Sequence, residues 1–585
     1  MKQSVLYLLK SILLSSLVLF SFDNANAQGF LDVKGKHIVD GKGEKVLLRG
    51  MGLGGWMLQE GYMLRFPKEG QQHRVKAAIE DVIGKDKTDE FYDAWLNNHT
   101  QKADIDSMKA WGFNSVRLPM HFNLYTLPIE EEPVKGKNTW LEKGFAMTDS
   151  LLAWCKANEM YLILDLHAAP GGQGNDYNIS DRDPNTLSLW DSEDNRNKTI
   201  ALWRKLAVRY ADEPWVGAYD LINEPNWGFA DPNDKNGLKE PRNIPLKKLM
   251  VDVTKAIREV DKKHIIIIEG NGWGNNYNGI LPTWDDKTVV SFHKYWNYNN
   301  QGSIQHFLDI RDKYNVPIWL GETGENSNVW FTQAISLMER NEIGWCWWPL
   351  KKMGFNNPLE IEVTDGYQQL INYWAGKGAK PSADAGYKTM MQMAENTLLK
   401  NNIIHYDVLD AMFRQVQSNK SIPFKSLSTS HIIQAVDYDM GWSNVAYFDK
   451  DSTEYYISTG TDRTGWNSGR TYRNDGVDIH KSADADNVFY VSKIEDGEWL
   501  NYTVNAAENG QYNLKLNIAS DNGTGKLSLL ANNLPAKSTA VPNTGGPQKW
   551  QSIELKNITL QKGVNNIRMR ADKGGFNFKS LEFSK

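Results

Sequence analysis

Residues 216–224, VGAYDLINE, form a short apolar run that ends in the polar pair Asn223 and Glu224. Other runs of similar length precede and follow it, and longer amphipathic stretches separate them at the spacing of repeated βα units. The eight runs are residues 46–53, 114–119, 161–167, 216–224, 264–270, 289–295, 317–323 and 344–350. Eight strands that alternate with helices predict a closed α/β barrel, the (β/α)8 or TIM fold.

Between and after these runs the sequence has helical periodicity, and it then changes character. We predict helices at residues 147–158, 198–211, 246–260, 329–341, 386–399 and 401–417. Residues 418–430, a polar stretch around Pro423, are predicted to be a linker. From residue 431 short alternating runs separated by Gly, Asn and Asp turns predict strands at residues 499–504, 512–518, 526–530, 551–558 and 566–569. We therefore expect a barrel domain over residues 28–417 and an all-β sandwich of the jelly-roll type over residues 431–585.

The N-terminus has the pattern of a secretory signal peptide. Lys2 precedes an apolar run at residues 12–22, and Ala25-Asn26-Ala27 supplies the small residues of a cleavage site. We expect residues 1–27 to be removed and the mature protein to be secreted or periplasmic. No later stretch of the sequence has the ~20 apolar residues that a membrane span requires.

The composition excludes some classes of partner. The 585 residues carry 66 Lys and Arg against 71 Asp and Glu, a net charge of −5, without the basic excess of proteins that bind nucleic acids. The 22 Trp and 24 Tyr suit stacking on sugar rings, although core packing explains such counts equally well. Cys155 and Cys346 are predicted to be buried thiols rather than a disulfide. The sequence carries no signal for an oligomeric state.

Functional side chains gather at the carboxyl ends of the predicted barrel strands, where the active sites of such barrels lie. They are Arg117 on the second strand, His167 on the third, Asn223 and Glu224 on the fourth, His293 and Tyr295 on the sixth, Glu322 on the seventh and Trp348 on the eighth. A single polar residue at a strand end is often a solvated turn or a helix cap. So many together predict one catalytic site at the mouth of the barrel.

Two of these residues, Glu224 and Glu322, are the candidate catalytic pair. They lie far apart in sequence, and the barrel places them across its mouth, on the fourth and seventh strands. Two carboxyl groups in one pocket divide roles, one protonated as an acid and the other ionised as a nucleophile. A separation of ~5 Å means retention of the anomeric configuration, and one of ~6.5–9.5 Å means inversion. The alternative is a pair of structural carboxylates, each bound to a neighbouring Arg or Lys.

Six motifs carry a family resemblance. They are Val116-Arg117-Leu118-Pro119, Asp165-Leu166-His167, Leu221-Ile222-Asn223-Glu224-Pro225, His293-Lys294-Tyr295, Gly321-Glu322-Thr323 and Gly344-Trp345-Cys346-Trp347-Trp348. Through them residues 30–399 resemble glycoside hydrolase family 5. The resemblance implies a retaining mechanism without metal or cofactor, with Glu224 as acid/base and Glu322 as nucleophile. It also implies that the nucleophile is oriented by Arg117 and Tyr295, that sugar hydroxyls are held by His167, Asn223 and His293, and that the sugar lies on Trp348.

Within that family one branch is more similar than the others. The stretches at residues 48–56, LRGMGLGGW, and 165–173, DLHAAPGGQ, resemble the fungal exo-β-1,3-glucanases. In that branch a carboxylate that matches Glu60 grips the terminal glucose, which implies a pocket and exo action. The alternative for Glu60 is a plain surface or helix-start carboxylate. The sequence departs from the branch at Trp296-Asn297-Tyr298 and at Pro349-Leu350-Lys351-Lys352, so the linkage it cleaves stays open.

The C-terminal segment has motifs of its own. Residues 434–438, QAVDY, Tyr472-Arg473, residues 497–502, GEWLNY, and residues 574–577, GGFN, resemble carbohydrate-binding module family 6. The resemblance implies a sugar held by Tyr472 and Asn577 at the loop end of the sandwich. Pro547 stands where the family has a second aromatic ring, which implies weaker binding. Val436 and Lys579 stand where the family often has acidic ligands of a structural calcium, so we expect no calcium there.

The sequence thus supports three hypotheses. The first is a secreted retaining hydrolase of β-glucan, with β-1,3 or β-1,6 linkages favoured and a C-terminal module that binds the polysaccharide. The second keeps the chemistry but gives an endo-acting, cellulase-like enzyme on β-1,4-glucan or another plant or algal polysaccharide. The third, a non-catalytic polysaccharide-binding protein, is opposed by the presence of both Glu224 and Glu322 with their neighbours. Transglycosylation, in which a sugar replaces water as acceptor, is compatible with the same residues.

Overall fold

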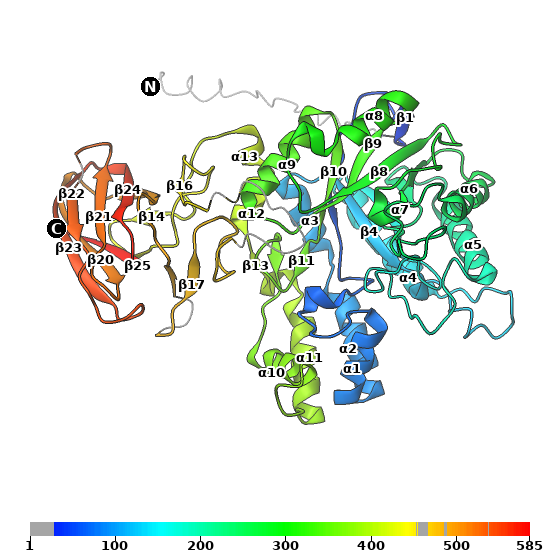
Figure 1. Cartoon of the computed structure of the whole chain (residues 1–585), viewed down its shortest axis with the longest axis horizontal. Coiled ribbons are helices and arrows are strands. Elements are labelled where there is room, and N and C mark those ends of the chain that lie inside the picture. The colour runs from blue at the N-terminus through cyan, green and yellow to red at the C-terminus, as the bar shows by residue number, and fades with distance from the viewer. Residues whose placement is uncertain (1–28, 452, 454–465, 485–487, 536) are drawn as a thin grey trace, which may run out of the picture.

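A computed structural model describes residues 29–585 except for 452, 454–465, 485–487 and 536. The predicted signal peptide, residues 1–27, lies outside the described residues. Within the described part of the chain, none of the helices is long and apolar enough to cross a membrane. The chain forms two domains, a barrel and a β-sandwich, which lie next to each other along the long axis of the molecule (Figure 1).

Eight parallel strands close into a barrel when the last strand pairs with the first. The strands are β3 (Arg49–Gly52), β4 (Ser115–His121), β5 (Tyr161–Ala168), β6 (Val216–Asp220), β7 (Ile265–Ile268), β8 (Thr288–Lys294), β9 (Ile318–Gly324) and β10 (Gly344–Trp348). Each coincides with one of the eight predicted runs, and the (β/α)8 prediction is confirmed. The strands are almost continuously apolar because side chains and helices cover both faces of a parallel barrel.

Helices surround the barrel, and some of them begin at a serine cap. They are α3 (Lys102–Trp111), α4 (Glu142–Ala157), α5 (Glu193–Tyr210), α6 (Ile244–Arg258), α7 (Asn271–Gly274), α8 (Gln305–Tyr314) and α9 (Asn328–Arg340). Ser192 and Ser327 accept a hydrogen bond from the backbone of the first turns of α5 and α9, which satisfies a donor that has no partner inside the helix. Buried side chains such as Trp203 and Trp330 pack these helices against the barrel wall.

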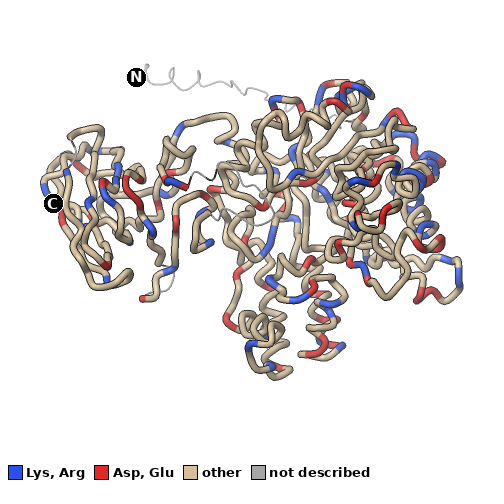
Figure 2. Tube along the Cα trace, viewed as in Figure 1, with Lys and Arg blue, Asp and Glu red and all other residues tan. Residues whose placement is uncertain are grey.

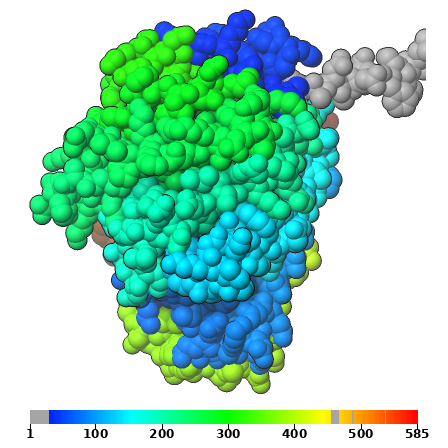
Figure 3. Space-filling view, turned by 90° about the vertical axis from the view of Figure 1, so that its right-hand side faces the viewer, coloured from blue at the N-terminus to red at the C-terminus, as the bar shows by residue number. Residues whose placement is uncertain are grey.

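Further elements cover the two ends of the barrel. The short ones are β1 (Asp32–Lys34), β2 (His37–Val39), β11 (Lys351–Lys352), β12 (Leu359–Glu360) and β13 (Ile403–Ile404), with the 3-10 turns Gly61–Leu64, Phe122–Leu124, Gln301–Ser303 and Leu399–Asn401. Helices α1 (Gln72–Ile83) and α2 (Lys85–Asn98) pack beside α10 (Asp365–Trp374) and α11 (Ala383–Asn396), although they are far apart in sequence (Figures 1 and 3). Trp374 donates its indole N–H to the carbonyl of Ala78, 3.3 Å away, and joins the two pairs.

The C-terminal domain is a sandwich of two mostly antiparallel sheets, each with six strands among the residues that the structure describes. One sheet contains β14 (Leu427–Ser428), β16 (Tyr447–Phe448), β19 (Trp499–Ala506), β21 (Lys526–Ala531), β22 (Lys537–Ala540) and β24 (Gly563–Lys573). The other contains β15 (Ile433–Gln434), β17 (Ile479–Lys481), β18 (Phe489–Val491), β20 (Gly510–Ala519), β23 (Gln551–Leu560) and β25 (Asn577–Ser584). Alternate residues of β19, such as Leu500 and Tyr502, face the core between the sheets, which confirms the all-β prediction.

The connection between the domains differs from the sequence prediction. Residues 401–417, predicted as one helix, form β13, α12 (Tyr406–Met412) and α13 (Arg414–Gln417), with a break at Phe413. The predicted linker, residues 418–430, is packed: its Leu427 is buried in the sandwich core and starts β14, which pairs in parallel with β19. Polar composition concealed this strand because it is only two residues long.

Buried polar contacts fix the sandwich to the barrel. Asn474 of the sandwich has no exposed surface, and its backbone N–H donates to Asp407 on α12 over 2.7 Å. Its side-chain amide donates to the carbonyl of Asn326 over 2.8 Å, and its own carbonyl accepts from the backbone of Asn328 over 2.8 Å. These hydrogen bonds hold Asn474 in one place and join the two domains at this point. Lys and Arg residues are interspersed with Asp and Glu residues along the trace of both domains (Figure 2).

Candidate active site

A cavity of about 530 Å³ opens at the carboxyl ends of the barrel strands. The predicted residues that line it are Glu60, His167, Glu224, His293, Tyr295, Glu322 and Trp348. Arg117 and Asn223 lie buried beside them, and both are hydrogen-bonded to lining residues. The structure therefore brings together all nine side chains that the sequence assigned to the barrel site.

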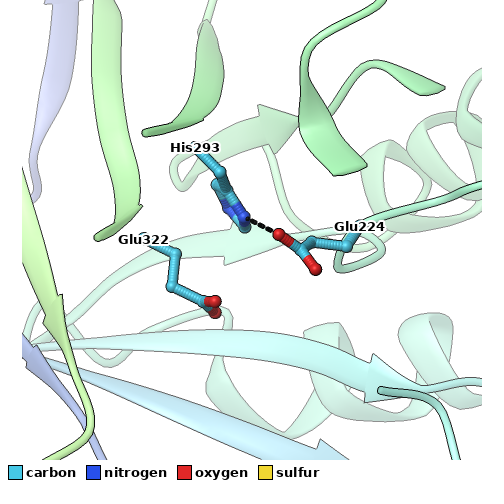
Figure 4. A group of neighbouring side chains, drawn as sticks. All are labelled: Glu224, His293 and Glu322. Atoms are coloured by element: carbon cyan, nitrogen blue, oxygen red, sulfur yellow. Dashed lines mark hydrogen bonds and ion pairs between the residues drawn. The ribbon is translucent and has the colours of Figure 1, made fainter. Parts of the chain in front are cut away.

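The two candidate catalytic carboxylates face each other across the cavity. Ligand atoms of Glu224, His293 and Glu322 all lie within 4.8 Å of one another. Figure 4 shows the Glu322 carboxylate directed toward the other two side chains, with a hydrogen bond joining His293 to Glu224. A separation near 5 Å is the one that retaining glycosidases have, and it leaves no room for the water molecule that inversion requires.

The surroundings of Glu224 suit a general acid. Its backbone has a φ of 44°, in the left-handed region, and its N–H donates to Glu269 Oε2 over 2.7 Å. Its carboxyl Oε1 lies 2.7 Å from His293 Nδ1. Burial raises the pKa of Glu224, and repulsion from Glu322 and Glu269 adds to the rise although the His293 hydrogen bond opposes it. A carboxyl group with a raised pKa is available to donate a proton near neutral pH.

The surroundings of Glu322 suit a nucleophile. Arg117 Nη1 donates to Glu322 Oε2, and the Tyr295 hydroxyl donates to Oε1, each over 2.9 Å. Burial and the nearby Glu322 charge raise the pKa of Tyr295 well above its usual value, so its hydroxyl remains a donor. These two donors hold the carboxylate in one orientation, with its charge next to the guanidinium of Arg117.

Arg117 itself rests on three buried carboxyl groups that the sequence analysis did not select. Its guanidinium lies 2.8 Å from Asp220, 3.1 Å from Glu269 and 3.3 Å from Asp165. Glu269 also lies 3.1 Å from His293 Nε2. Burial opposes the charge on His293, but Glu269 and Glu224 outweigh it and raise the pKa of His293 well above its usual value.

The sequence of each domain matches a known protein family. Residues 75–354 match the family model of the cellulases, glycosyl hydrolase family 5. The barrel is a family 5 glycosyl hydrolase domain. Residues 469–585 match carbohydrate binding module family 6, so both resemblances seen in the sequence are confirmed. The chain is a retaining glycoside hydrolase, which supports the two catalytic hypotheses over a non-catalytic binding protein.

Three proteins with similar sequences have names that state different activities. A beta-xylosidase of Phanerodontia chrysosporium is 26% identical over 61% of this chain and 78% of its own length. Endoglucanase C of Acetivibrio thermocellus is 26% identical over 49% of this chain and 92% of its own length. A probable glucan 1,3-beta-glucosidase A of Aspergillus niger is 30% identical over 31% of this chain and 41% of its own length.

Two stacked rings, those of His167 and Trp348, form part of the wall of the catalytic pocket. The rings of His167 and Trp348 are stacked, with centroids 5.0 Å apart and planes 5° from parallel. His167 Nδ1 lies 2.7 Å from Asp165, and the Asn223 amide donates to its Nε2 over 3.1 Å, so the imidazole is held in one orientation. The Trp348 indole donates to the Tyr62 hydroxyl over 3.1 Å, which fixes the plane of the larger ring.

Glu60 lies inside the pocket, not on the surface. Its side chain is 7% exposed and lines the cavity with Tyr62 and Trp348. Burial raises the pKa of Glu60 well above its usual value, and the charges of Glu322 and Glu325 add to the rise. A buried carboxyl group at this position is suited to exchanging hydrogen bonds with sugar hydroxyls.

The same side chains are the candidate metal ligands of the described residues, because Glu224, His293 and Glu322 bring donor atoms within 4.8 Å. Their hydrogen bonds do not fit a metal ion. Both Glu322 oxygens accept from Arg117 and Tyr295, and both His293 nitrogens face carboxylates. With its raised pKa the imidazole carries protons on both nitrogens and has no lone pair to offer.

The family 6 module has a cavity of its own, of about 370 Å³. Asn577 lines it together with Tyr490, His480 and Pro547, whereas Tyr472 is not among the lining residues. The hydroxyl of Tyr472 is bonded to Asp437, and its ring packs on Phe489 at the side of the sandwich. The structure therefore does not bring Tyr472 to the cavity that Asn577 lines, and Tyr490 lies there instead.

The sequence signal for Tyr490 was its position on a short strand before a polar turn. Tyr490 lies on β18, pairs with His480 on β17, and its ring is 5.9 Å from the imidazole of that residue. At the position where family 6 modules often hold calcium, Val436 is buried, and Lys579 forms an ion pair with Asp484 over 2.8 Å.

Proposed function

We propose that this chain is a secreted β-glucanase that hydrolyses β-glucosidic bonds, with β-1,3 or β-1,6 linkages favoured, and acts from the chain end. The observation that carries the proposal is the Glu224 and Glu322 pair within 4.8 Å, at the base of a pocket that also holds the buried Glu60. The similarity to a named glucan 1,3-beta-glucosidase supports the linkage.

The proposed reaction has two steps. In the first, an oxygen of Glu322 attacks the anomeric carbon, the glycosidic C–O bond breaks, and the proton of Glu224 moves to the leaving oxygen. In the second, Glu224 takes a proton from water, the water oxygen attacks the anomeric carbon, and Glu322 leaves as a carboxylate. Arg117 and Tyr295 orient Glu322, and His167, Asn223, His293 and Trp348 hold the sugar at the point of cleavage.

The second candidate is an endo-acting hydrolase of β-1,4-glucan. The endoglucanase of Acetivibrio thermocellus favours it, because 92% of that protein's length aligns with this chain. A closed pocket and an open cleft differ in the role of Glu60, which in the first case bonds the end of the chain and in the second binds an internal unit.

The product profile decides between the two candidates. Wild-type protein is incubated with β-1,3-, β-1,6- and β-1,4-glucans, the Glu322→Ala variant is the blank, and proton NMR follows the first anomer released. Release of β-glucose alone from β-1,3- or β-1,6-glucan supports the proposal. Longer oligosaccharides support the endo candidate, and Glu60→Ala then leaves the product length unchanged. Initial release of the α-anomer contradicts both.

A further inference from the structure

A second cavity, of about 480 Å³, opens beside the catalytic pocket. Tyr62, Trp296 and Glu325 line both cavities and form the border between them. A glycan that leaves the catalytic pocket at this border therefore enters the second cavity directly.

The two domains share the walls of this second cavity. The barrel supplies Phe355 and its neighbours, and the module supplies Trp466, Gly469 and Arg470. Trp466 is 9% exposed and forms a buried apolar cluster with Phe355, against which Trp296 packs. Aromatic rings for the apolar face of a sugar, with charged donors at the edges, are the usual lining of a sugar site.

Three charged side chains of the cavity, those of Lys352, Glu325 and Arg65, are held in place by other residues. Lys352 lies 2.5 Å from Glu325 in an ion pair that is largely buried, and its ammonium lies 5.8 Å from the Tyr62 ring. Arg65 donates to the carbonyl of Met353 over 3.3 Å. A site whose side chains are fixed before the ligand arrives loses little conformational entropy on binding.

The module wall is fixed to the segment that follows β9, the strand that carries the nucleophile Glu322. The Trp466 indole donates to the Asn474 side chain over 2.8 Å. Asn474 in turn is bonded to Asn326 and Asn328, in the segment that follows β9 and therefore Glu322. Trp466 thus belongs to the same contact that holds the segment after β9.

We propose that this cavity is a distal subsite, which binds a sugar unit removed from the cleaved bond, and that Trp466 and Arg470 of the module set the chain-length preference of the catalytic domain. The proposal rests on the glucanase activity proposed above. Binding of a remote sugar contributes to catalysis at the reacting centre, so its loss lowers kcat/KM on long substrates more than on short ones.

The test compares kcat/KM for a long and a short β-glucan oligosaccharide of the linkage that the wild-type chain cleaves. In full-length protein, Trp466→Ala is expected to reduce the long-to-short ratio about tenfold, and Arg470→Ala about threefold, which corresponds to the loss of one aromatic contact and one hydrogen bond.

The matched control is Trp442→Ala. Trp442 is another tryptophan of the module that contacts the barrel, through its indole and the carbonyl of Gln415 over 2.9 Å, and it lines neither cavity. The ratio stays at the wild-type value in this variant. Arg470 is exposed, so its variant folds even where Trp466→Ala lowers the melting temperature.

The two possible failures are distinguishable. A wild-type ratio in both Trp466→Ala and Arg470→Ala, with glucan hydrolysis intact, overturns the distal subsite and leaves the proposed function standing. A wild-type chain that cleaves none of the β-glucans overturns the proposed function together with the subsite that rests on it. A fall in the ratio in Trp442→Ala equal to that in Trp466→Ala also contradicts the subsite, because it indicates a general effect of the domain contact.

Discussion

The catalytic pocket of the barrel and the module cavity around Asn577 are built in different ways. In the barrel, every functional side chain except Glu60 lies on a strand or shortly after its end, and the closed sheet fixes the neighbours of each strand, so Glu224 and Glu322 meet although they are far apart in sequence. In the module, Tyr490 and Asn577 lie on strands, but Pro547 comes from a loop whose path the strand pattern does not determine. The position of a side chain is therefore easier to predict from the sequence in the barrel than in the sandwich.

The largest effect is expected at the nucleophile. Glu322→Ala removes the group that forms the covalent intermediate, and turnover should fall by about 10⁴-fold or more on every substrate. Steady-state rates on an aryl β-glucoside and on glucan measure it. Added azide should restore part of the aryl-glucoside activity with the α-glycosyl azide as product, because the small anion fits the space left by the carboxylate. A residual rate above one tenth of wild type contradicts the assignment.

A smaller and selective loss is expected at the acid. Glu224→Ala should reduce glucan hydrolysis by about 10³-fold, since a sugar leaving group needs a proton. Formation of the glycosyl-enzyme from substrates with good leaving groups should be spared, and burst kinetics with a dinitrophenyl glycoside measure that step. Equal losses on both kinds of substrate would show that Glu224 does not protonate the leaving group.

The pH dependence of kcat/KM tests the role of Glu224 through its hydrogen-bond partner His293. Glu224 acts as an acid only while protonated, so kcat/KM falls as the pH rises through its pKa, which burial has raised. The His293 hydrogen bond lowers that pKa, and the change His293→Ala should therefore move the alkaline limb to higher pH. Conversely, a limb that moves to lower pH, or stays in place, would mean that another group controls it. His306→Ala, a change on the outer helix α8, is the control.

The barrel strands and eight of the nine site residues were predictable because the period of apolar runs and the polar strand ends are local features of the sequence, whereas Glu60 was predicted only from the family resemblance. Asp165, Asp220 and Glu269 were missed, although Glu269 directly follows the fifth strand. Their role depends on the side chains that point into the barrel at one level, and this register appears only when the sheet closes around Arg117. The contact of Asn474 with the barrel was equally invisible, because it joins two domains.

The segment that connects the two domains was also predicted incorrectly from its composition. Residues 401–417 have helical composition, but docking of the sandwich at Asp407 and the break at Phe413 divide them into a strand and two helices. Leu427 belongs to a polar stretch by composition and to the sandwich core by position. Tertiary packing decides such short segments, since their intrinsic preferences are weak.

The smallest effect separates the two tyrosines of the module. Tyr490→Ala should weaken binding of soluble glucan to the full-length Glu322→Ala protein by up to about tenfold, the value of one aromatic contact, because Tyr490 lines the cavity with Asn577. Tyr472→Ala should leave the affinity at its starting value, since its hydroxyl is bonded to Asp437 away from that cavity. Isothermal titration calorimetry measures both, and melting temperatures show whether each variant is folded. The reverse order of effects would restore the pairing of Tyr472 with Asn577 that the sequence predicted, and would place the sugar on the flank of the sandwich that faces the barrel.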